Sequence, residues 1–509
     1  MSISVVRKNV VANFMSNGWT ALVAVLLIPL YIKFLGVEAW GVVGIYVSLQ
    51  SVCTLLDVGL SASLNRELAR LSLHKDKAQE MRNLVRTMEL LYWSLAILAG
   101  ATIFALAPVI ARHWVRASQL SPAIIQSAIR LMGLTICLQW PFGLYAGGLS
   151  GLQRQVLLSG MSAGIAALRG LGAVLVLWKI SPTLHAFFWW QVGVSVLQTC
   201  LAGLFMWHNL PLTESASTFQ STLLRRTWRF TAGMSGFAIV SIIISQMDKV
   251  ILSRMLSLEM FGYYVLAGAV ATGIYLPVTP IFSALYPIFT QLVSLGDKEG
   301  LKELYHHGCQ LMSVMILPIS VVIVFFSKEI LFIWTGNSTT VARTHLILSI
   351  LVIGTALNGL IHLPHALQLA HGWTKLPFSL NLVLVIILVP GIILMTSMYG
   401  AVGAAFIWVI FNGALAIVGI QLMHRRLLRG EQWRWYFEDV GLPLAVSVGM
   451  ALLCLLIVPT EGARIQLLMF LAGATLFVAG PTLLATPVTR AGFVSYVRSL
   501  RGRALNVSQ

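Results

Sequence analysis

The sequence predicts an all-α membrane protein with about 14 transmembrane helices. Hydrophobic residues make up 58% of the 509 residues and charged residues only 10%, whereas a soluble domain has about 45–50% apolar and about 25% charged residues. The apolar residues gather into stretches that are long enough to cross a bilayer as helices of about 20 residues. The stretches lack the alternation of a transmembrane barrel, so we expect helices, which satisfy their own backbone hydrogen bonds. This composition excludes a soluble enzyme.

The predicted spans follow one another as two groups of six, with two further spans at the C-terminal end. The first apolar run follows Arg7 and Lys8 and resembles a signal sequence, but it contains Asn13 and Asn17 and ends at no clear small-residue cleavage site, so we interpret it as a retained helix. The spans are residues 10–31, 39–60, 88–110, 122–149, 156–178, 184–206, 230–253, 262–287, 308–327, 344–370, 376–396, 400–423, 441–458 and 464–485.

The distribution of basic residues predicts the orientation. Lys and Arg number 34 against 17 acidic residues, a net charge of +17. Most of them fall in segments that are cytoplasmic if the N-terminus is cytoplasmic, among them residues 61–87, 207–229 and 424–440. Both termini are therefore predicted to be cytoplasmic, with the basic loops against anionic membrane lipids. Because no basic stretch interleaved with aromatic residues forms a separate module, nucleic acid is not an expected partner.

An internal repeat supports two lobes. Residues 35–41 (LGVEAWG) match residues 256–262 (LSLEMFG), and each copy lies between equivalent helices of its lobe. Because six helices is an even number, the lobes share one orientation and should be related by a pseudo-twofold axis along the membrane normal. The predicted domains are an N-terminal lobe (1–206), a cytoplasmic linker (207–229), a C-terminal lobe (230–424), and two additional helices with a cytoplasmic tail (425–509).

Motifs for covalent chemistry or metal binding are missing from the sequence. The five cysteines lie in or beside apolar stretches, without a CxxC pair or a Cys/His cluster at metal spacing. No zinc-protease, serine-hydrolase or paired-carboxylate motif is present. We therefore expect neither an enzyme nor a resident cofactor, apart from a coupling H+ or Na+.

Several loose motifs resemble the polysaccharide-biosynthesis flippases often called Wzx, which belong to the multidrug/oligosaccharidyl-lipid/polysaccharide exporter superfamily. The resemblance covers roughly residues 1–425. It is carried by residues 17–18 (NG), 28–31 (IPLY), 35–36 (LG), 40–41 (WG), 46 (Y), 56–60 (LDVGL), 65–66 (NR), 248–252 (DKVIL), 261–264 (FGYY), 267 (A) and 399–405 (YGAVGAA).

The resemblance implies two six-helix lobes around a central cavity that opens alternately to the two sides of the bacterial inner membrane. It implies that the substrate is an undecaprenyl-diphosphate-linked oligosaccharide, carried from the cytoplasmic to the periplasmic leaflet for O-antigen, capsule or exopolysaccharide assembly. A polysaccharide polymerase and a chain-length regulator are the implied protein partners.

Two arginines inside predicted spans are the candidate substrate-binding residues. Exposing a charge to lipid costs about 2.5–3.5 kcal/mol even on the lenient insertion scale, so such residues usually face a cavity or a partner. Arg130 and Arg169 reach nearly the same depth on neighbouring spans, and two guanidiniums there would suit a diphosphate or an acidic sugar. The alternative is that each one is capped by backbone carbonyls or extends towards a surface.

Four further residues are candidates for a gate or for ion coupling. Asp57 in one lobe and His362 and His365 in the other lie near cytoplasmic helix ends and could form a pH-sensitive inner gate. Alternatively, Asp57 caps its own helix end and the histidines bond locally around Pro364. Asp248 could bind a coupling cation, or form an ion pair with Lys33, Lys249 or Arg254.

Two other functions remain open at this point. The first is a cation-coupled multidrug exporter of the same superfamily, although the first span has no acidic residue and arginines in the cavity would repel cationic drugs. The second is a membrane subunit of a polysaccharide synthase, which should show a larger outside loop or an acidic catalytic pair.

Overall fold

The computed structural model describes residues 3–57, 59–224, 243–459, 464–487 and 490. Across these residues the chain is built from helices, and one isolated β-bridge joins Arg116 and Ser257. Eleven helices in the described part are long and apolar enough to cross a membrane. The all-α membrane fold is thus confirmed. Most of the predicted seventh span, 230–253, lies outside the described residues, and its last part, from residue 243, is helical.

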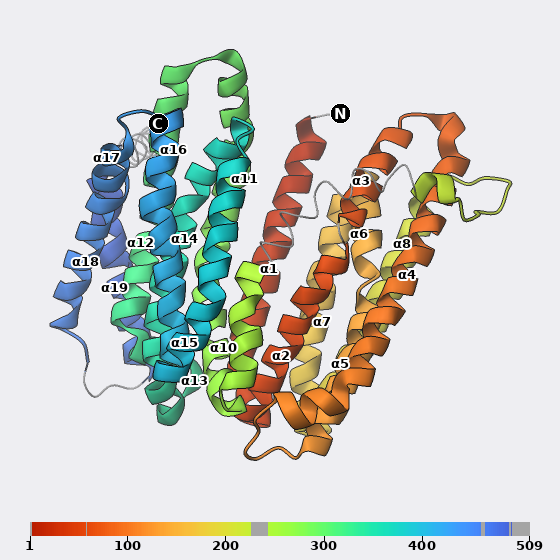
Figure 1. Cartoon of the computed structure of the whole chain (residues 1–509), viewed down its shortest axis with the longest axis horizontal. Helices are drawn as coiled ribbons and strands as arrows, with labels where there is room; N and C mark the ends of the chain where they lie inside the picture. Colours follow the sequence, from red (N-terminus) through yellow and green to blue (C-terminus); the bar gives the residue numbers. More distant parts are fainter. Residues whose placement is uncertain (1–2, 58, 225–242, 460–463, 488–489, 491–509) are drawn as a thin grey trace, which may run out of the picture. The chain divides into compact units, whose positions relative to one another are not determined.

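The chain divides into two compact units, Met1–Val265 and Leu266–Gln509. The predicted domain boundaries stay a prediction. In unit 1, α1 packs against α7, while α5 packs against α4 and α8 (Figure 1). The elements of unit 1 are α1 (Ile3–Leu35), α2 (Val37–Cys53), η1 (Thr54–Asp57), α3 (Leu60–Leu71), η2 (Lys75–Lys77), α4 (Ala78–Val109), η3 (Ile110–Trp114), α5 (Pro122–Gln139), α6 (Phe142–Gly151), α7 (Gln155–Lys179) and α8 (Leu184–Asn209).

The second predicted span is shorter than expected. Helix α2 ends at Cys53, and the chain passes through η1 and Gly59, whose φ of 80° suits a residue without a Cβ. The next helix, α3, is amphipathic, and its buried leucines recur at helical spacing at Leu60, Leu64, Leu68 and Leu71. The expectation of one helix over 39–60 is therefore wrong at its end, because the hydrophobic pattern continues through a backbone break.

The two copies of the internal repeat pack on each other within unit 1. A Cβ on Gly41, in α2, would overlap the carbonyl oxygen of Leu258, at the start of α10 (Leu258–Ala271). Reciprocally, a Cβ on Gly262 would overlap the carbonyl oxygen of Val37. Gly41 and Val37 are the repeat equivalents of Gly262 and Leu258, so the contact has the reciprocity that a twofold relation predicts.

Unit 2 is built around two buried helices. Helices α12 and α14 have 67% and 61% of their most apolar windows buried, against 50% or less for the other candidate spans of the described chain. Beyond α10, the elements are η4 (Thr272–Ile274), α11 (Tyr275–Leu295), α12 (Lys298–Phe325), α13 (Ser327–Thr335), α14 (Ser338–Ala370), α15 (Lys375–Ala414), η5 (Leu415–Gly419), α16 (Ile420–Leu427), α17 (Gln432–Arg434), η6 (Trp435–Gly441), α18 (Leu442–Leu455) and α19 (Arg464–Ala485).

The last two helices form a pair that packs on α12 (Figure 1). Their shared core consists of Val321, Val322, Phe326, Ala451, Cys454, Ala474 and Val478. The predicted spans 376–396 and 400–423 follow each other without a loop, and they are separated by Gly400, with φ 61° and ψ −142°. Only glycine adopts this conformation readily, so Gly400 breaks what would otherwise be a single very long helix.

Candidate functional site

Arg169 lies in a polar cluster between α7 and α8. Its Nη1 donates to Gln191 Oε1 at 2.9 Å, and its Nη2 donates to Gln198 Oε1 at 2.8 Å and to Ser195 Oγ at 3.3 Å. These three partners recur at about one helical turn along α8, so they present one face to the guanidinium. The partners are neutral, so they position the charge of Arg169 without neutralising it.

Two tyrosines and two further amides extend this cluster. Tyr31 and Tyr46 lie close to Arg169, and Tyr31 donates to the carbonyl oxygen of Gly170 at 3.0 Å. Gln50 donates to Gln139 Oε1 at 2.9 Å, and Tyr46 donates to the same oxygen at 3.3 Å. We call the set of Tyr31, Tyr46, Gln50, Gln139, Arg169, Gln191, Ser195 and Gln198 the Arg169 cluster.

The Arg169 cluster contains no carboxylate. Among the ion pairs of the described residues, none involves Arg169. A guanidinium held by neutral amides keeps its positive charge available to an anion. Chemically, the cluster is suited to hold a phosphate or a carboxylate, and it holds no acid or nucleophile for covalent catalysis.

Arg130 lies in different surroundings. Its guanidinium stacks over the Phe104 ring of α4, 5.0 Å from the ring centroid, and the residue is exposed. Helix α5 packs mainly against α4 and α8, whereas α7 packs mainly against α1 and α8. The side-chain contacts of Arg130 and Arg169 are thus separate, and one shared site for the two guanidiniums stays a prediction. Consecutive spans need not be packing neighbours, and the sequence does not show which face of a helix carries each arginine.

Asp57 makes local contacts. Its carboxylate accepts from the backbone N–H of Ser61 at 3.1 Å and from Ser61 Oγ at 2.7 Å, and it also accepts from the hydroxyl of Tyr92. These bonds satisfy a free donor in the first turn of α3. Asp57 thus holds the first turn of the following helix, α3, and not the end of its own helix, as the alternative reading of the sequence expected.

The two candidate histidines lie on α14 in unit 2. His362 Nδ1 is 2.9 Å from the carbonyl oxygen of Asn358, one turn earlier, and its ring lies 5.8 Å from that of Tyr275. His365 lies close to His362. The gate that would join these histidines to Asp57 stays a prediction.

Asp248 forms an ion pair with one of its three expected partners. Lys249 Nζ lies 3.2 Å from Asp248 Oδ1, and Tyr264 donates to Asp248 Oδ2 at 2.8 Å. Arg254 instead stacks over the Trp114 ring at 5.3 Å. Whether Asp248 also binds a coupling cation stays a prediction.

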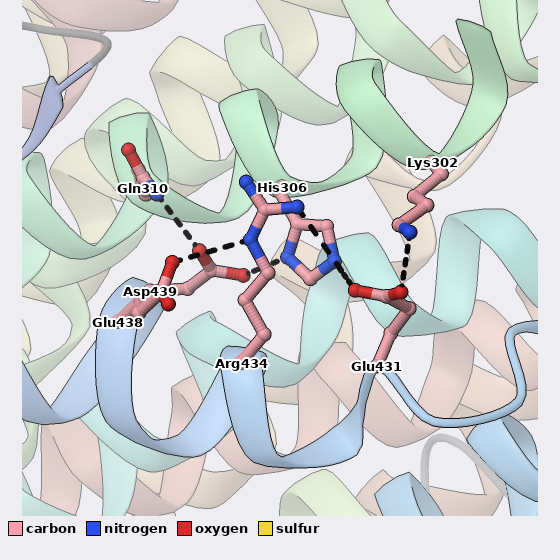
Figure 2. A network of polar contacts seen from close by, with 7 residues as sticks. All are labelled: Lys302, His306, Gln310, Glu431, Arg434, Glu438 and Asp439. Carbon is pink, nitrogen blue, oxygen red and sulfur yellow. Dashed lines mark hydrogen bonds and ion pairs between the residues drawn. The ribbon is translucent and has the colours of Figure 1, made fainter. Parts of the chain in front are cut away.

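Sequence reasoning missed a buried ionic network in unit 2. His306 on α12 contacts Asp439 on η6 and Glu431 just before α17, and Lys302 contacts Glu431 (Figure 2). These residues fall just outside the predicted spans 308–327 and 441–458, where charged residues are usually solvated. One signal in the sequence could have indicated this network. His306 and Gln310 are polar residues at helical spacing at the start of a predicted span, so their side chains lie on the same face of a helix.

The fold defines a class of protein, a multi-pass all-helical membrane protein, and the Arg169 cluster places a positive charge inside one helical unit. Residues 6–293 match the model of the family described as "Polysaccharide biosynthesis protein", and residues 234–394 match the family "MatE". The first match covers more than half of the chain, which therefore belongs to the polysaccharide biosynthesis protein family.

Individual proteins agree with this assignment. The chain is 23% identical over 402 residues to the Shigella flexneri protein named "Putative O-antigen transporter", covering 79% of this chain and 93% of that protein. Its fold is similar to that of the lipid II flippase MurJ in an inward closed conformation, with a TM-score of 0.70, 13% identity, and coverage of 94% of this chain and 98% of MurJ. An inward-facing multidrug resistance MATE family transporter gives a TM-score of 0.67 at 14% identity, with coverage of 80% of this chain and 94% of that one. The Shigella flexneri relative is named as a transporter, and the two solved structures show that the fold is shared.

Proposed function

We propose that this protein flips undecaprenyl-diphosphate-linked oligosaccharide repeat units from the cytoplasmic to the periplasmic leaflet of the bacterial inner membrane, by alternating access, for O-antigen, capsule or exopolysaccharide assembly. Its family, and its similarity along 93% of the length of an O-antigen transporter, support this function. A coupling ion, H+ or Na+, and contacts with a polysaccharide polymerase and a chain-length regulator belong to the same proposal.

The observation that carries the proposal is the charge of Arg169. The guanidinium lies between α7 and α8 and is held by the amides of Gln191 and Gln198. A diphosphate offers several acceptor oxygens to such a group, and Arg matches phosphate geometry through its planar fork. Arg169 would then hold the anionic part of the substrate, while the lipid tail remains in the bilayer.

The match of residues 234–394 to the MatE family favours a second candidate, a cation-coupled multidrug exporter. A site for cationic drugs needs negative or aromatic groups to attract the drug. The Arg169 cluster contains two tyrosines but no carboxylate, and its guanidinium would repel a cation. On electrostatic grounds an anionic substrate is therefore preferred over a cationic one.

The test replaces Arg169 in a strain that lacks its own copy of this protein. We expect Arg169→Ala to lower polysaccharide export more than about tenfold at normal protein abundance, because a charge-assisted hydrogen bond contributes about 1.5–3 kcal/mol. Arg169→Lys should keep part of the export, since it keeps the charge and loses the planar fork. Arg130→Ala, the matched control on the exposed side of α5, should have a milder effect.

Because Arg169 also joins α7 to α8, thermal unfolding of the purified variants must accompany the export assay. Arg169→Met keeps most of the side-chain volume and separates loss of charge from loss of packing. If Arg169→Ala and Arg169→Met fold normally and export at the wild-type rate, the anion-binding role of Arg169 is wrong. Increased drug sensitivity of the deletion strain with unchanged polysaccharide would favour the exporter.

A further inference from the structure

The ring of His306 is completely buried between two carboxylates (Figure 2). Its Nδ1 lies 2.5 Å from Asp439 Oδ2, and its Nε2 lies 3.1 Å from Glu431 Oε2. The side chains of His306 and Asp439 are both 0% exposed. Both ring nitrogens therefore face an oxygen that, when ionised, can only accept a hydrogen bond.

This geometry requires one more proton than a neutral imidazole supplies. Neutral histidine has one N–H donor and one acceptor nitrogen, and an ionised carboxylate has no donor. If all three groups took these forms, one nitrogen lone pair would face a carboxylate oxygen at hydrogen-bond distance. Either the imidazole carries a second proton or one of the two carboxyl groups carries it, so the three groups share one bound proton.

Two basic residues lie on the Glu431 side of the three groups. Lys302 Nζ lies 2.6 Å from Glu431 Oε1, and Arg434 Nε lies 3.2 Å from Glu438 Oε2. Arg434 Nη1 also lies 4.0 Å from Glu431 Oε2. Arg434 and Glu438 are 41% and 61% exposed, so water screens this pair. The fully buried pair is His306 and Asp439. With the extra proton this pair is neutral, and without it the pair carries a negative charge, which a low-dielectric environment disfavours. Gln310 Nε2 donates to Asp439 Oδ1 at 3.0 Å. This hydrogen bond satisfies the carboxylate oxygen of Asp439 that does not face His306.

Glu431 is the least suited of the three to hold the proton. Burial raises the pKa of Glu431, but its hydrogen bond to Lys302 and the positive charge of Lys302, together with His306, outweigh burial and hold the pKa below the usual glutamate value. At neutral pH, Glu431 therefore stays ionised. The proton is left to His306 and Asp439, which lie 2.5 Å apart and share it.

Other titratable groups near the network do not supply a competing donor to His306. The Tyr305 ring packs 5.2 Å from that of His306, and the His424 ring of α16 lies 5.6 Å from that of Tyr305. At Gly308, α11 and α14 contribute Leu285 and Leu363. His424 also interacts electrostatically with His306 and Glu431. Further titratable groups in the described part of unit 2 are Glu299 near Lys302, Cys309 and Tyr436 near Tyr305, His307 paired with Glu303, and His362 and His365 close to each other on α14.

We propose that His306, Asp439 and Glu431 form a buried proton-binding site, and that the bound proton attaches the segment before α18 to α12. Asp439 lies in η6, a π-helical turn that directly precedes α18, and such turns are frequent at functional sites. When the proton is lost, the lone pair of a His306 nitrogen faces a carboxylate oxygen. The resulting repulsion weakens the attachment of the segment before α18 to α12. Glu431 and Asp439 lie within residues 424–440, the segment predicted to be cytoplasmic, so we expect the site to respond to the cytoplasmic pH.

The first test is the thermal stability of the purified full-length protein as a function of pH. From about pH 7 upwards an unfolded chain has neutral histidine and ionised carboxylates, so the folded state binds one proton more than the unfolded state. Stability must then fall as the pH rises. Between about pH 6 and about pH 9 we expect the Tm of the wild type to fall by about 3 °C or more.

Asp439→Asn is the decisive variant. An asparagine can accept from Gln310 through its oxygen and donate through its amide to His306 Nδ1, so a neutral imidazole can donate from Nε2 to Glu431. The extra proton is then unnecessary, and the Tm should lose its dependence on alkaline pH. His307→Gln is the matched control, because this neighbouring histidine is 43% exposed and lies on the same helix. It should follow the wild type.

A second measurement reports on local opening. Cys309 is buried one turn from His306 and close to Asp439. In a protein in which the other four cysteines are serine, maleimide labelling of Cys309 should rise with pH more steeply when Asp439 is retained than in the Asp439→Asn variant. Comparing these two backgrounds removes the intrinsic pH dependence of thiol reactivity.

Two results overturn the proposal: a wild-type Tm that does not change between about pH 6 and about pH 9, or an Asp439→Asn variant with the same pH dependence of Tm and of labelling as the wild type. The experiments use no transport substrate. Their failure would leave the proposed flippase function intact, and failure of the Arg169 test would leave the proton site intact.

Discussion

At the scale of single residues, the polar groups of this chain are held mainly by neighbours one turn away or on the next helix. Asp57 shows the first case. It accepts two hydrogen bonds from Ser61 and one from Tyr92, so its local role is to cap α3. A residue with this role should tolerate loss of charge better than loss of its oxygen atoms.

We therefore expect Asp57→Asn to keep most of the stability, whereas Asp57→Ala should cost about 1 kcal/mol, a common value for a lost helix cap. Thermal unfolding of the purified variants measures both effects. Asp76→Ala, at an exposed acid of the same unit, is the control and should change little. If Asp57→Asn folds normally but abolishes export, the charge itself is needed, and the gate hypothesis gains support over the cap.

Arg130 and Arg169 show how the same residue type has two kinds of surroundings, although the sequence predicts a similar depth for both. The Arg130 side chain is exposed and stacks on Phe104, while Arg169 bonds three side chains of α8. The hydrophobic pattern placed both residues in spans, because a span is recognised by its average composition. The direction in which each arginine side chain points depends on which helices pack around it, and this packing is a property of the tertiary structure.

At the scale of elements, the contact between α2 and α10 depends on two glycines. Gly41 and Gly262 each face a backbone carbonyl oxygen of the other helix. Small residues let helix backbones approach closely, which is how many membrane helices associate. The repeat motif thus has a structural reason for ending in glycine in both copies.

We expect Gly41→Ala and Gly262→Ala to destabilise the protein by similar amounts, about 1–3 kcal/mol each, because an added Cβ forces the backbones apart. Gly268→Ala is the control, since a Cβ there meets nothing within 4 Å. The Tm of the three variants checks the prediction. Equal Tm values for Gly41→Ala and Gly268→Ala would show that the two helices do not need this close approach.

At the scale of the whole molecule, the basic residues predict which loops face the cytoplasm. The positive-inside rule reflects the cost of moving Lys and Arg across the membrane during insertion, together with their attraction to anionic lipids. Asp76 and Ala216 are exposed positions in the predicted cytoplasmic segments 61–87 and 207–229. Single cysteines at these positions can report the orientation of the chain.

We expect a membrane-impermeant thiol reagent added outside intact spheroplasts to leave Asp76→Cys and Ala216→Cys unmodified, and to label both after the membrane is opened. The background should lack the exposed Cys200. A cysteine in a segment predicted to lie outside, such as Ala117→Cys, serves as the positive control. Labelling of the first two variants in intact cells would reverse the predicted orientation.

The sequence by itself determined the class of the protein and most of its spans, because hydropathy is a local property that each helix carries in its own residues. It also determined the internal repeat and the family resemblance. The ends of helices and the breaks between them were harder to predict, as at Cys53, because an apolar pattern can continue through a change of backbone direction.

Only the tertiary structure decided which polar groups meet. His306 and Asp439 lie 133 residues apart in the sequence, and each one reads as a residue of a solvated loop. Their contact arises because α18 packs against α12, which carries Asp439 of η6 to the buried face of α12. Pairing across such distances depends on the packing of whole helices, and a pattern of residues along one chain contains no record of it.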